Sequence, residues 1–128
     1  MKLLLDTHAL LWADSEPGKL SATAQGLLTD PTNERWLSVA SLWEMQIKSQ
    51  LGKLRLRLPL RDLMAEQMAK NGVQLLDITA SHVFEIGALP PLHSDPFDRL
   101  IIAAARTKGA TVLTQDPLVR QYPVPTVW

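Results

Sequence analysis

The chain has 128 residues, of which 46% are hydrophobic and 20% are charged, and its formal net charge at pH 7 is zero. This composition is typical of one folded domain and excludes a disordered chain. The sequence contains no cysteine, no apolar run that would cross a bilayer and no signal-peptide pattern. We therefore expect a soluble, cytoplasmic protein without disulfides or thiolate metal sites. Because the chain is neutral, only a local basic patch would attract a nucleic acid.

Apolar, strand-like runs alternate with helical patterns along the whole chain. Strands are predicted at residues 2–5, 36–39, 73–78, 111–114 and 126–128. Helices are predicted over residues 9–13, 21–29, 41–51, 60–70, 79–89 and 96–108. This alternation predicts the α/β class, as a three-layer α/β/α sandwich with a central, mainly parallel sheet.

Serine residues mark the starts of two helices in the first half of the chain. Ser21 is suited to cap the helix that ends near Thr29. Ser41 and Glu44 form a Ser-x-x-Glu capping pattern, which predicts the start of the helix that ends near Leu51. On this interpretation, capping alone is enough to explain Glu44.

The middle of the chain combines an alternating segment with an amphipathic helix. Residues 53–59 alternate basic and leucine side chains, as a short strand would, although Pro59 restricts the segment to a sheet edge or a loop. In the helix that follows, Leu63, Met64 and Met68 are predicted to face the core.

The stretch from Asp95 to Asp116 carries strong local signals. Asp95 can cap a helix that begins at a proline, and Asp98 then lies in the first turn. Residues 100–105 are apolar on every face of that helix, which predicts that other elements surround it. Gly109 ends the helix, and Asp116 lies just beyond the carboxyl end of the short β-branched strand that follows.

Four acids occupy equivalent positions at the end of a strand or in the first turn of the helix that follows. They are Asp6, Glu44, Asp98 and Asp116. In a parallel sheet these positions meet at one edge, where ligands bind. Crowded carboxylates repel one another, and a raised pKa or a bound cation relieves the repulsion. An all-oxygen ligand set favours Mg²⁺ or Mn²⁺, which supports phosphodiester hydrolysis without a protein nucleophile.

Each of these acids, taken singly, also has a structural explanation. Glu44 completes the capping pattern, and Asp98 interacts favourably with the helix dipole. Asp6 and Asp116 can start turns. The four together favour a functional site, because independent caps need not share one edge of one sheet.

Four segments match a known protein family in order and spacing, and they span nearly the whole chain. They are Leu4-Leu5-Asp6-Thr7-His8, Ser38-Val39-Ala40-Ser41-Leu42-Trp43-Glu44, Asp95-Pro96-Phe97-Asp98-Arg99-Leu100-Ile101-Ile102-Ala103 and Thr114-Gln115-Asp116. In these segments the chain resembles PIN domains, and specifically VapC-type ribonuclease toxins of type II toxin–antitoxin pairs. One position departs from the pattern, because many relatives carry a basic residue where Gln115 stands.

The resemblance implies a single PIN domain over residues 1–128 that acts as a toxin and a metal-dependent endoribonuclease. The catalytic residues would hold Mg²⁺ or Mn²⁺, so that an activated water attacks the RNA phosphodiester. These residues would be Asp6, Glu44, Asp98 and Asp116. Asp98 is preferred to Asp95, because the family's acid precedes the apolar helix by this spacing. Residues that would orient the carboxylates are Thr7, Thr114 and Asp95.

The expected partners are an RNA substrate, a cognate antitoxin and a second copy of the chain in a homodimer, with no membrane. Candidates for contact with RNA or the antitoxin are Lys48, Lys53, Arg55, Arg57 and Arg99, together with Arg61. Trp12 and Trp43 are candidates for lining a cleft where an antitoxin segment docks. His8 and His93 are interpreted as orienting or packing residues, whereas His82 is predicted to lie on a helix surface.

Three other functions use similar patterns. A haloacid dehalogenase phosphatase also begins with an apolar strand and an aspartate, but it needs a second acid where His8 stands. A receiver domain needs a lysine near the last strand, and none is well placed. A PIN-like module that binds RNA or a partner without cutting would usually lack one acid, whereas all four are present. This silent binding module is the alternative function.

Overall fold

Five parallel strands form the central sheet of the computed structural model, which describes all 128 residues. The strands are β1 (Lys2–Leu5), β2 (Glu34–Ser38), β3 (Val73–Leu76), β4 (Thr111–Leu113) and β5 (Thr126–Val127). They lie in the order β3-β2-β1-β4-β5, and every neighbouring pair is parallel. The predicted α/β fold is confirmed, and the sheet is entirely rather than mainly parallel.

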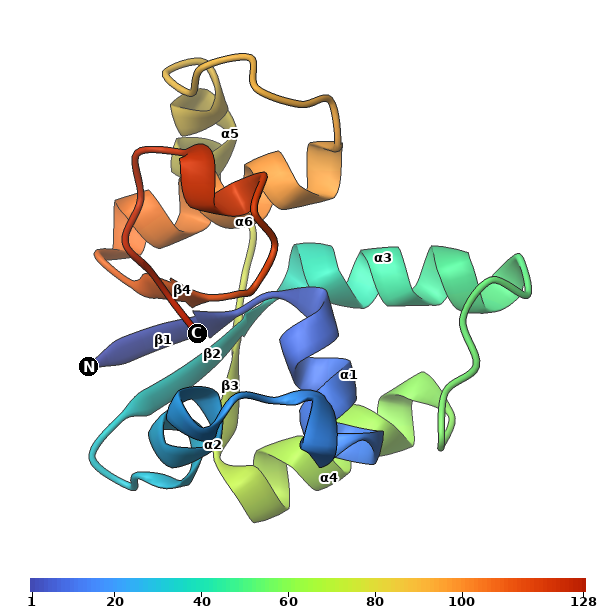
Figure 1. Cartoon of the computed structure of the whole chain (residues 1–128). Coiled ribbons are helices and arrows are strands. Elements are labelled where there is room, and N and C mark those ends of the chain that lie inside the picture. The colour runs from blue at the N-terminus through green and yellow to red at the C-terminus, as the bar shows by residue number, and fades with distance from the viewer.

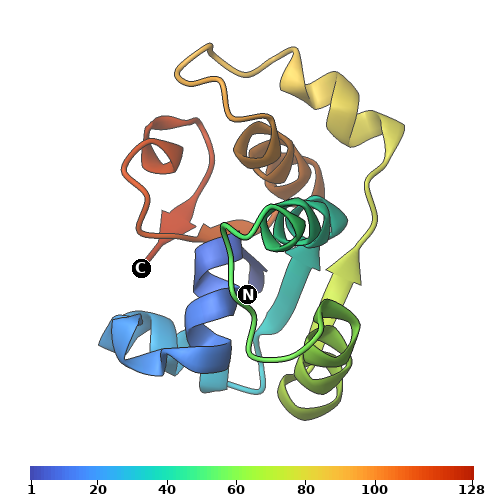
Figure 2. The same ribbon diagram turned by 90° about the vertical axis from the view of Figure 1, so that its right-hand side faces the viewer.

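Helices cover both faces of the sheet (Figure 1). They are α1 (Thr7–Ser15), α2 (Ala22–Thr29), α3 (Val39–Gln50), α4 (Leu60–Asn71), α5 (Ala80–Ile86) and α6 (Pro96–Lys108), with short 3₁₀ turns η1 (Pro17–Lys19) and η2 (Val119–Gln121). α5 and α6 lie on one face, α1, α2 and α4 lie on the other, and α3 extends away from the end of β2 (Figure 1, Figure 2). None of the helices is both long enough and apolar enough to cross a membrane.

β1 contributes to a hydrophobic core on each side of the sheet, because alternate side chains of a strand point to opposite faces. Leu4 is buried among the side chains of α6, whereas Leu3 and Leu5 are buried on the other face with Leu10 and Met45. Burial on both faces is typical of strands in parallel sheets. The acid that follows β1 is therefore attached to the rigid centre of the molecule.

α6 begins and ends as its sequence predicts. Asp95 Oδ1 accepts hydrogen bonds from the backbone N–H groups of Phe97 at 2.9 Å and Asp98 at 3.2 Å. At the other end, Gly109 adopts a left-handed conformation with φ of 69°. Every residue from Leu100 to Ala105 is buried. The buried middle of α6 thus holds Asp98 at a fixed place beside the edge of the sheet.

α3 begins earlier than the capping pattern predicts. Ser38, not Ser41, is the N-cap, and its Oγ accepts a hydrogen bond from the backbone N–H of Ala40 at 3.1 Å. β2 runs directly into the helix, so its last residue already has the extended conformation that a cap requires. Ser41 is fully buried inside α3, and Glu44 lies in the second turn without a capping role.

Residues 53–59 form a loop rather than a strand. Leu54, Leu56 and Leu58 pack against the core, and the basic side chains between them are exposed. No neighbouring strand pairs with this segment. Its alternating pattern therefore reflects a loop that covers one side of the core.

Two predictions about burial are wrong. Met68 is 45% exposed, and Gln67 is buried in its place, where its amide donates a hydrogen bond to Asp14. His82 is only 4% exposed, because its ring accepts a hydrogen bond from the backbone N–H of Thr79 in a capping box at the start of α5. In both cases a polar side chain is buried because it has a hydrogen-bond partner.

Candidate active site

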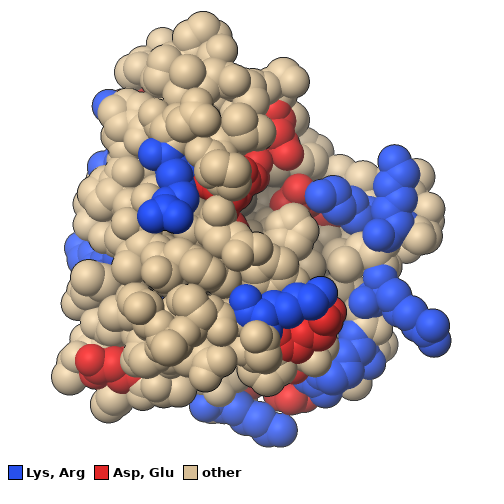
Figure 3. Space-filling model, in the orientation of Figure 1, with Lys and Arg blue, Asp and Glu red and all other residues tan.

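A small polar cavity lies at the carboxyl edge of the sheet, beside α3 and α6. Its volume is about 130 Å³, and no hydrophobic side chain lines it. The lining residues are Asp6, Thr7, His8, Glu44, Lys48, Asp95, Asp98 and Asp116. Figure 3 shows acidic side chains gathered in a hollow of the molecular surface. The structure therefore brings the four predicted acids together around one cavity.

Asp6 and Asp116 are each held by one backbone N–H group. Asp6 Oδ1 accepts a hydrogen bond from Ala9 at 2.7 Å, at the start of α1. Asp116 Oδ1 accepts one from Leu118 at 2.9 Å, and the backbone N–H of Asp116 donates to the Thr114 hydroxyl at 3.0 Å. Thr114 thus stabilises the turn that presents Asp116. The second oxygen of Asp116 makes no hydrogen bond within the chain.

Glu44 is almost completely buried, and both of its oxygens are engaged. The Thr7 hydroxyl donates to Glu44 Oε1 at 2.6 Å and lies 3.1 Å from the Ser41 hydroxyl. Lys48, one turn further along α3, forms an ion pair with Glu44 Oε2 at 2.9 Å. These contacts fix the direction of the carboxylate and place one ammonium group among the acids.

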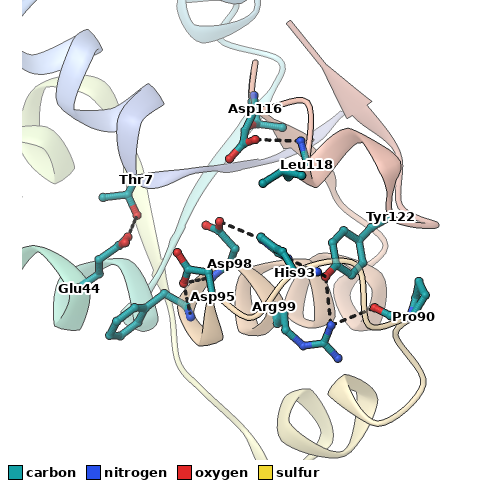
Figure 4. Close-up of polar contacts among 12 residues, drawn as sticks. Thr7, Glu44, Pro90, His93, Asp95, Asp98, Arg99, Asp116, Leu118 and Tyr122 are labelled. Atoms are coloured by element: carbon teal, nitrogen blue, oxygen red, sulfur yellow. Dashed lines mark hydrogen bonds and ion pairs between the residues drawn. The ribbon is translucent and has the colours of Figure 1, made fainter.

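Asp98 is oriented by a histidine and a tyrosine from outside its own helix. His93 Nε2 lies 3.2 Å from Asp98 Oδ2, and His93 Nδ1 lies 2.7 Å from the Tyr122 hydroxyl (Figure 4). Only 23% of the Asp98 side chain is exposed. The two aromatic residues therefore support one oxygen of Asp98 and leave the other directed towards the cavity.

Two acids of the cavity have raised pKa values, because burial and neighbouring charges disfavour their ionised forms. Burial, followed by the charge of Asp95, raises the pKa of the Asp98 carboxyl to about 6, against the hydrogen bond from His93. Burial also raises the pKa of Asp6, although the Thr114 hydroxyl and a backbone N–H group oppose it. The hydrogen bond to Glu44 raises the pKa of Lys48, the only lysine or arginine in the lining. The cavity thus carries excess negative charge.

The donor set fits a hard divalent cation in its chemistry, although the side chains do not converge on one point. No three acidic or histidine side chains are arranged to hold a single ion together. Asp6, Asp98 and Asp116 each use one oxygen in the hydrogen bonds described above, whereas Glu44 uses both. Carboxylate oxygens are nevertheless the ligands that Mg²⁺ and Mn²⁺ prefer.

The basic residues that were predicted to contact RNA or the antitoxin have different surroundings in the fold. Lys48 lines the cavity, and Lys53 and Arg55 are exposed on the loop that follows α3. Arg57 on the same loop pairs with Asp14 at 2.8 Å and Glu66 at 3.0 Å. The charge of Arg57 is therefore compensated within the chain, outside the acidic cavity.

Arg99 does not line the cavity, although it follows Asp98 in sequence. Its guanidinium donates to the backbone carbonyl of Pro90 at 2.9 Å, to that of Ile86 at 3.4 Å and to the Tyr122 hydroxyl at 3.0 Å (Figure 4). Arg99 therefore ties α6 to the segment after α5 and to the tyrosine that supports His93.

Arg99→Ala is expected to lower the free energy of unfolding by about 2 kcal/mol, because carbonyl groups and a phenol lose a charged donor. The loss is to be measured by urea denaturation. Arg120→Ala is the matched control, because Arg120 is exposed and makes no ion pair; it is expected to change stability by less than about 0.5 kcal/mol. Equal losses in the two variants would contradict the bridging role of Arg99.

Two supporting contacts were not foreseen from the sequence. The Glu44–Lys48 pair has the i, i+4 spacing of neighbours on a helix, so the sequence alone could have predicted this ion pair. Tyr122 is 29 residues from His93 and lies in no motif. Only the folding of the C-terminal segment over α6 brings the phenol to the histidine.

Comparison with known proteins reveals clear relatives. Residues 3–124 match the PIN domain family. The chain is 31% identical to Ribonuclease VapC22 of Mycobacterium tuberculosis, over 98% of this chain and 98% of that protein. The crystal structure of VapBC2 from Rickettsia felis bound to promoter DNA has a TM-score of 0.75 at 18% identity, covering 99% of this chain and 98% of that chain. DNA-bound VapBC from Salmonella typhimurium has a TM-score of 0.69 at 15% identity, and the match covers 99% of this chain and 97% of that chain.

The family match extends from β1 to the segment just before β5, so it includes all four acids of the cavity. The fold, with its parallel sheet and helices on both faces, also agrees with the solved structures. Sequence and structure therefore lead to the same assignment: the chain belongs to the PIN domain family.

Proposed function

We propose that this protein is a metal-dependent endoribonuclease and the toxin of a type II toxin–antitoxin pair. The observation that carries this proposal is the cavity in which carboxylates from four separate elements meet without any hydrophobic lining. The proposed catalytic and metal-binding residues are Asp6, Glu44, Asp98 and Asp116. The similarity to Ribonuclease VapC22 supports ribonuclease activity.

When bound, Mg²⁺ or Mn²⁺ would neutralise charge on the phosphodiester and make a water molecule more acidic. Asp6, Asp98 and Asp116 would hold the ion. Glu44 would complete the set by exchanging its contact with Thr7 or Lys48 for the ion. Lys48 would face the RNA phosphate from the same cavity. Asp6, Asp98 and Asp116 lie at strand ends or at a helix start, and Glu44 and Lys48 lie further along α3. These elements pack in the core, so the chain itself would orient the substrate.

An antitoxin protein is the proposed regulatory partner. Three of the related solved structures are VapBC complexes, and two of these three hold DNA. We also propose that the chain forms a homodimer. Phe84 on α5 is 76% exposed and Val83 beside it is 51% exposed, which supports a protein contact at this helix.

The test is cleavage of end-labelled single-stranded and structured RNA by the purified protein with Mn²⁺, with Mg²⁺ and with EDTA. We expect cutting with either ion and none with EDTA, and we expect Asp6→Asn to reduce the rate by at least about a hundredfold. Asp62→Asn is the matched control, because Asp62 is exposed in the first turn of α4 and does not line the cavity. Cutting that survives in Asp6→Asn would remove these acids from the mechanism.

The alternative function is a module that binds RNA or protein without cutting it. One observation favours it: both oxygens of Glu44 are engaged within the chain, by Thr7 and Lys48. Calorimetric titration with Mn²⁺ separates the two functions. Saturable binding at one or two sites supports the nuclease, whereas absence of binding together with absence of cleavage supports the silent module.

A further inference from the structure

A second cavity adjoins the acidic one and is large enough for a nucleobase. Its volume is about 430 Å³, and it is lined by Asp6, His8, Trp12, Gln115, Asp116 and Pro117. Three of these residues, Asp6, His8 and Asp116, also line the acidic cavity. The two cavities therefore meet at the same carboxylates, so a group held in one lies next to a group held in the other.

Trp12 gives the second cavity a fixed aromatic wall. Its ring makes an edge contact with Trp128 at 5.7 Å between centroids, and His8 lies 5.6 Å away on the same helix. Lys19 places its ammonium 5.9 Å from the Trp12 ring. These contacts restrain the indole in one orientation. Aromatic rings held in this way are surfaces on which unpaired bases of single-stranded RNA stack.

Gln115 supplies the only side-chain amide of this cavity, beside the carboxylates of Asp6 and Asp116 and the imidazole of His8. It is exposed, and it lies between the fully buried Thr114 and the anchored Asp116, so its backbone is well fixed. A glutamine amide offers both a donor and an acceptor, which lets it pair with the edge of a base. Trp12 and Pro117 contribute mainly apolar surface, so neither can distinguish one base from another by hydrogen bonding.

We propose that the cavity between Trp12 and Gln115 binds the nucleobase that adjoins the cleaved phosphodiester, and that the Gln115 amide determines which base is preferred there. This inference rests on the proposed ribonuclease function, because the shared carboxylates would define the bond that is cut. Trp12 supplies stacking for any base, and Gln115 discriminates between bases.

The first experiment measures sequence preference with the full chain and Mn²⁺ on a pool of randomised single-stranded RNA, with the cut ends identified by sequencing. Gln115→Ala is expected to reduce the preference at one position beside the cut by about tenfold. Gln74→Ala is the matched control, because Gln74 is exposed on β3 and outside both cavities; it should leave the preference unchanged. An unaltered preference in Gln115→Ala overturns the inference.

Trp12 is tested by steady-state kinetics on one RNA oligonucleotide. Trp12→Ala is expected to raise KM about tenfold with a smaller change in kcat, and Trp12→Phe is expected to restore most of the affinity, because a phenyl ring still stacks. Trp12 packs against the core. The fold of each variant is therefore checked by circular dichroism, and Trp12→Phe decides the outcome if the alanine variant unfolds.

A binding measurement that needs no catalysis separates failure of this inference from failure of the proposed function. The four nucleoside 5′-monophosphates are added to the isotope-labelled protein in EDTA, and the NMR signals of the Trp12 indole and the Gln115 amide are followed. Saturable shifts there, with the Trp36 indole unchanged, support the base site even if no RNA is cut. If RNA is cut but these signals do not move, the cavity holds no base, and a segment of a partner protein becomes its expected occupant.

Discussion

Asp98→Asn is expected to make the metal-free protein more stable above pH 6 while abolishing RNA cleavage. Burial and the neighbouring acids raise the pKa of the Asp98 carboxyl to about 6, from 3.8 for the free side chain. The folded state therefore prefers the protonated form, and the wild type loses stability as the pH rises from about 4 to about 6. Asparagine is neutral at every pH, so the variant does not have this penalty.

The size of the expected gain in stability follows from the raised pKa of Asp98. A change of about two pKa units corresponds to ~3 kcal/mol, and we reduce this to about 1 to 2 kcal/mol because the side chain is partly exposed and screened by solvent. The unfolding temperature should then rise by about 3 to 8 °C at about pH 7.5. Asparagine can still accept a hydrogen bond from His93, so the orientation of the side chain does not oppose the gain.

Thermal unfolding in EDTA at several pH values between about 4 and 8 is the measurement. The difference between Asp98→Asn and wild type should be largest above pH 6 and should disappear near pH 4, where Asp98 is protonated. Asp62→Asn again serves as the control, because Asp62 is exposed and does not line the acidic cavity. A variant that is less stable than wild type at every pH would show that hydrogen bonds, not repulsion, dominate at Asp98.

Divalent ions are expected to stabilise the wild type, because a bound cation relieves the electrostatic repulsion among the acids of the cavity. An ion that binds only the folded state at about one hundred times its Kd adds about 2.7 kcal/mol. For a domain of this size the unfolding temperature should rise by about 10 °C. The lower pKa of Asp98 in the bound form should also remove most of the pH dependence described above.

The measurement is thermal unfolding with about 10 mM MgCl₂ or MnCl₂, with NaCl at equal ionic strength as the reference. Asp98→Asn should respond weakly, because it lacks one of the charges that attract the ion. Addition of EDTA should reverse the shift in the wild type. An equal shift in both proteins would place the bound ions outside the acidic cavity.

Local rules explain why much of the fold is readable from the sequence. Asp95, a proline at the first position and Gly109 mark the ends of α6, because caps depend on backbone geometry within a few residues. Alternation of strands and helices predicts a parallel sheet, and a parallel sheet places Asp6 and Asp116 at one edge. The meeting of the four acids thus follows from topology without any knowledge of side-chain contacts.

Two wrong predictions, on the cap of α3 and on the buried face of α4, arise where neighbouring residues compete for the same role. Ser38 and Ser41 are both suited to cap α3, and the exact end of β2 selects Ser38. Gln67 is buried instead of Met68 because Asp14 reaches it from another helix. Asp14 is 53 residues from Gln67, so the deciding atom lies outside the window in which a sequence pattern is read.

The sequence by itself determined the fold class, the family and the four acids, because each depends on short-range spacing and on the order of strands. Only the tertiary structure decided how Glu44 and Asp98 are held. His93 reaches Asp98 with the support of Tyr122, and Thr7 orients Glu44 across 37 residues. The contacts of Tyr122 with His93 and of Thr7 with Glu44 join segments that are far apart in sequence, so they form only in the folded chain. For the same reason, the cavity next to the acids became visible only in the folded chain.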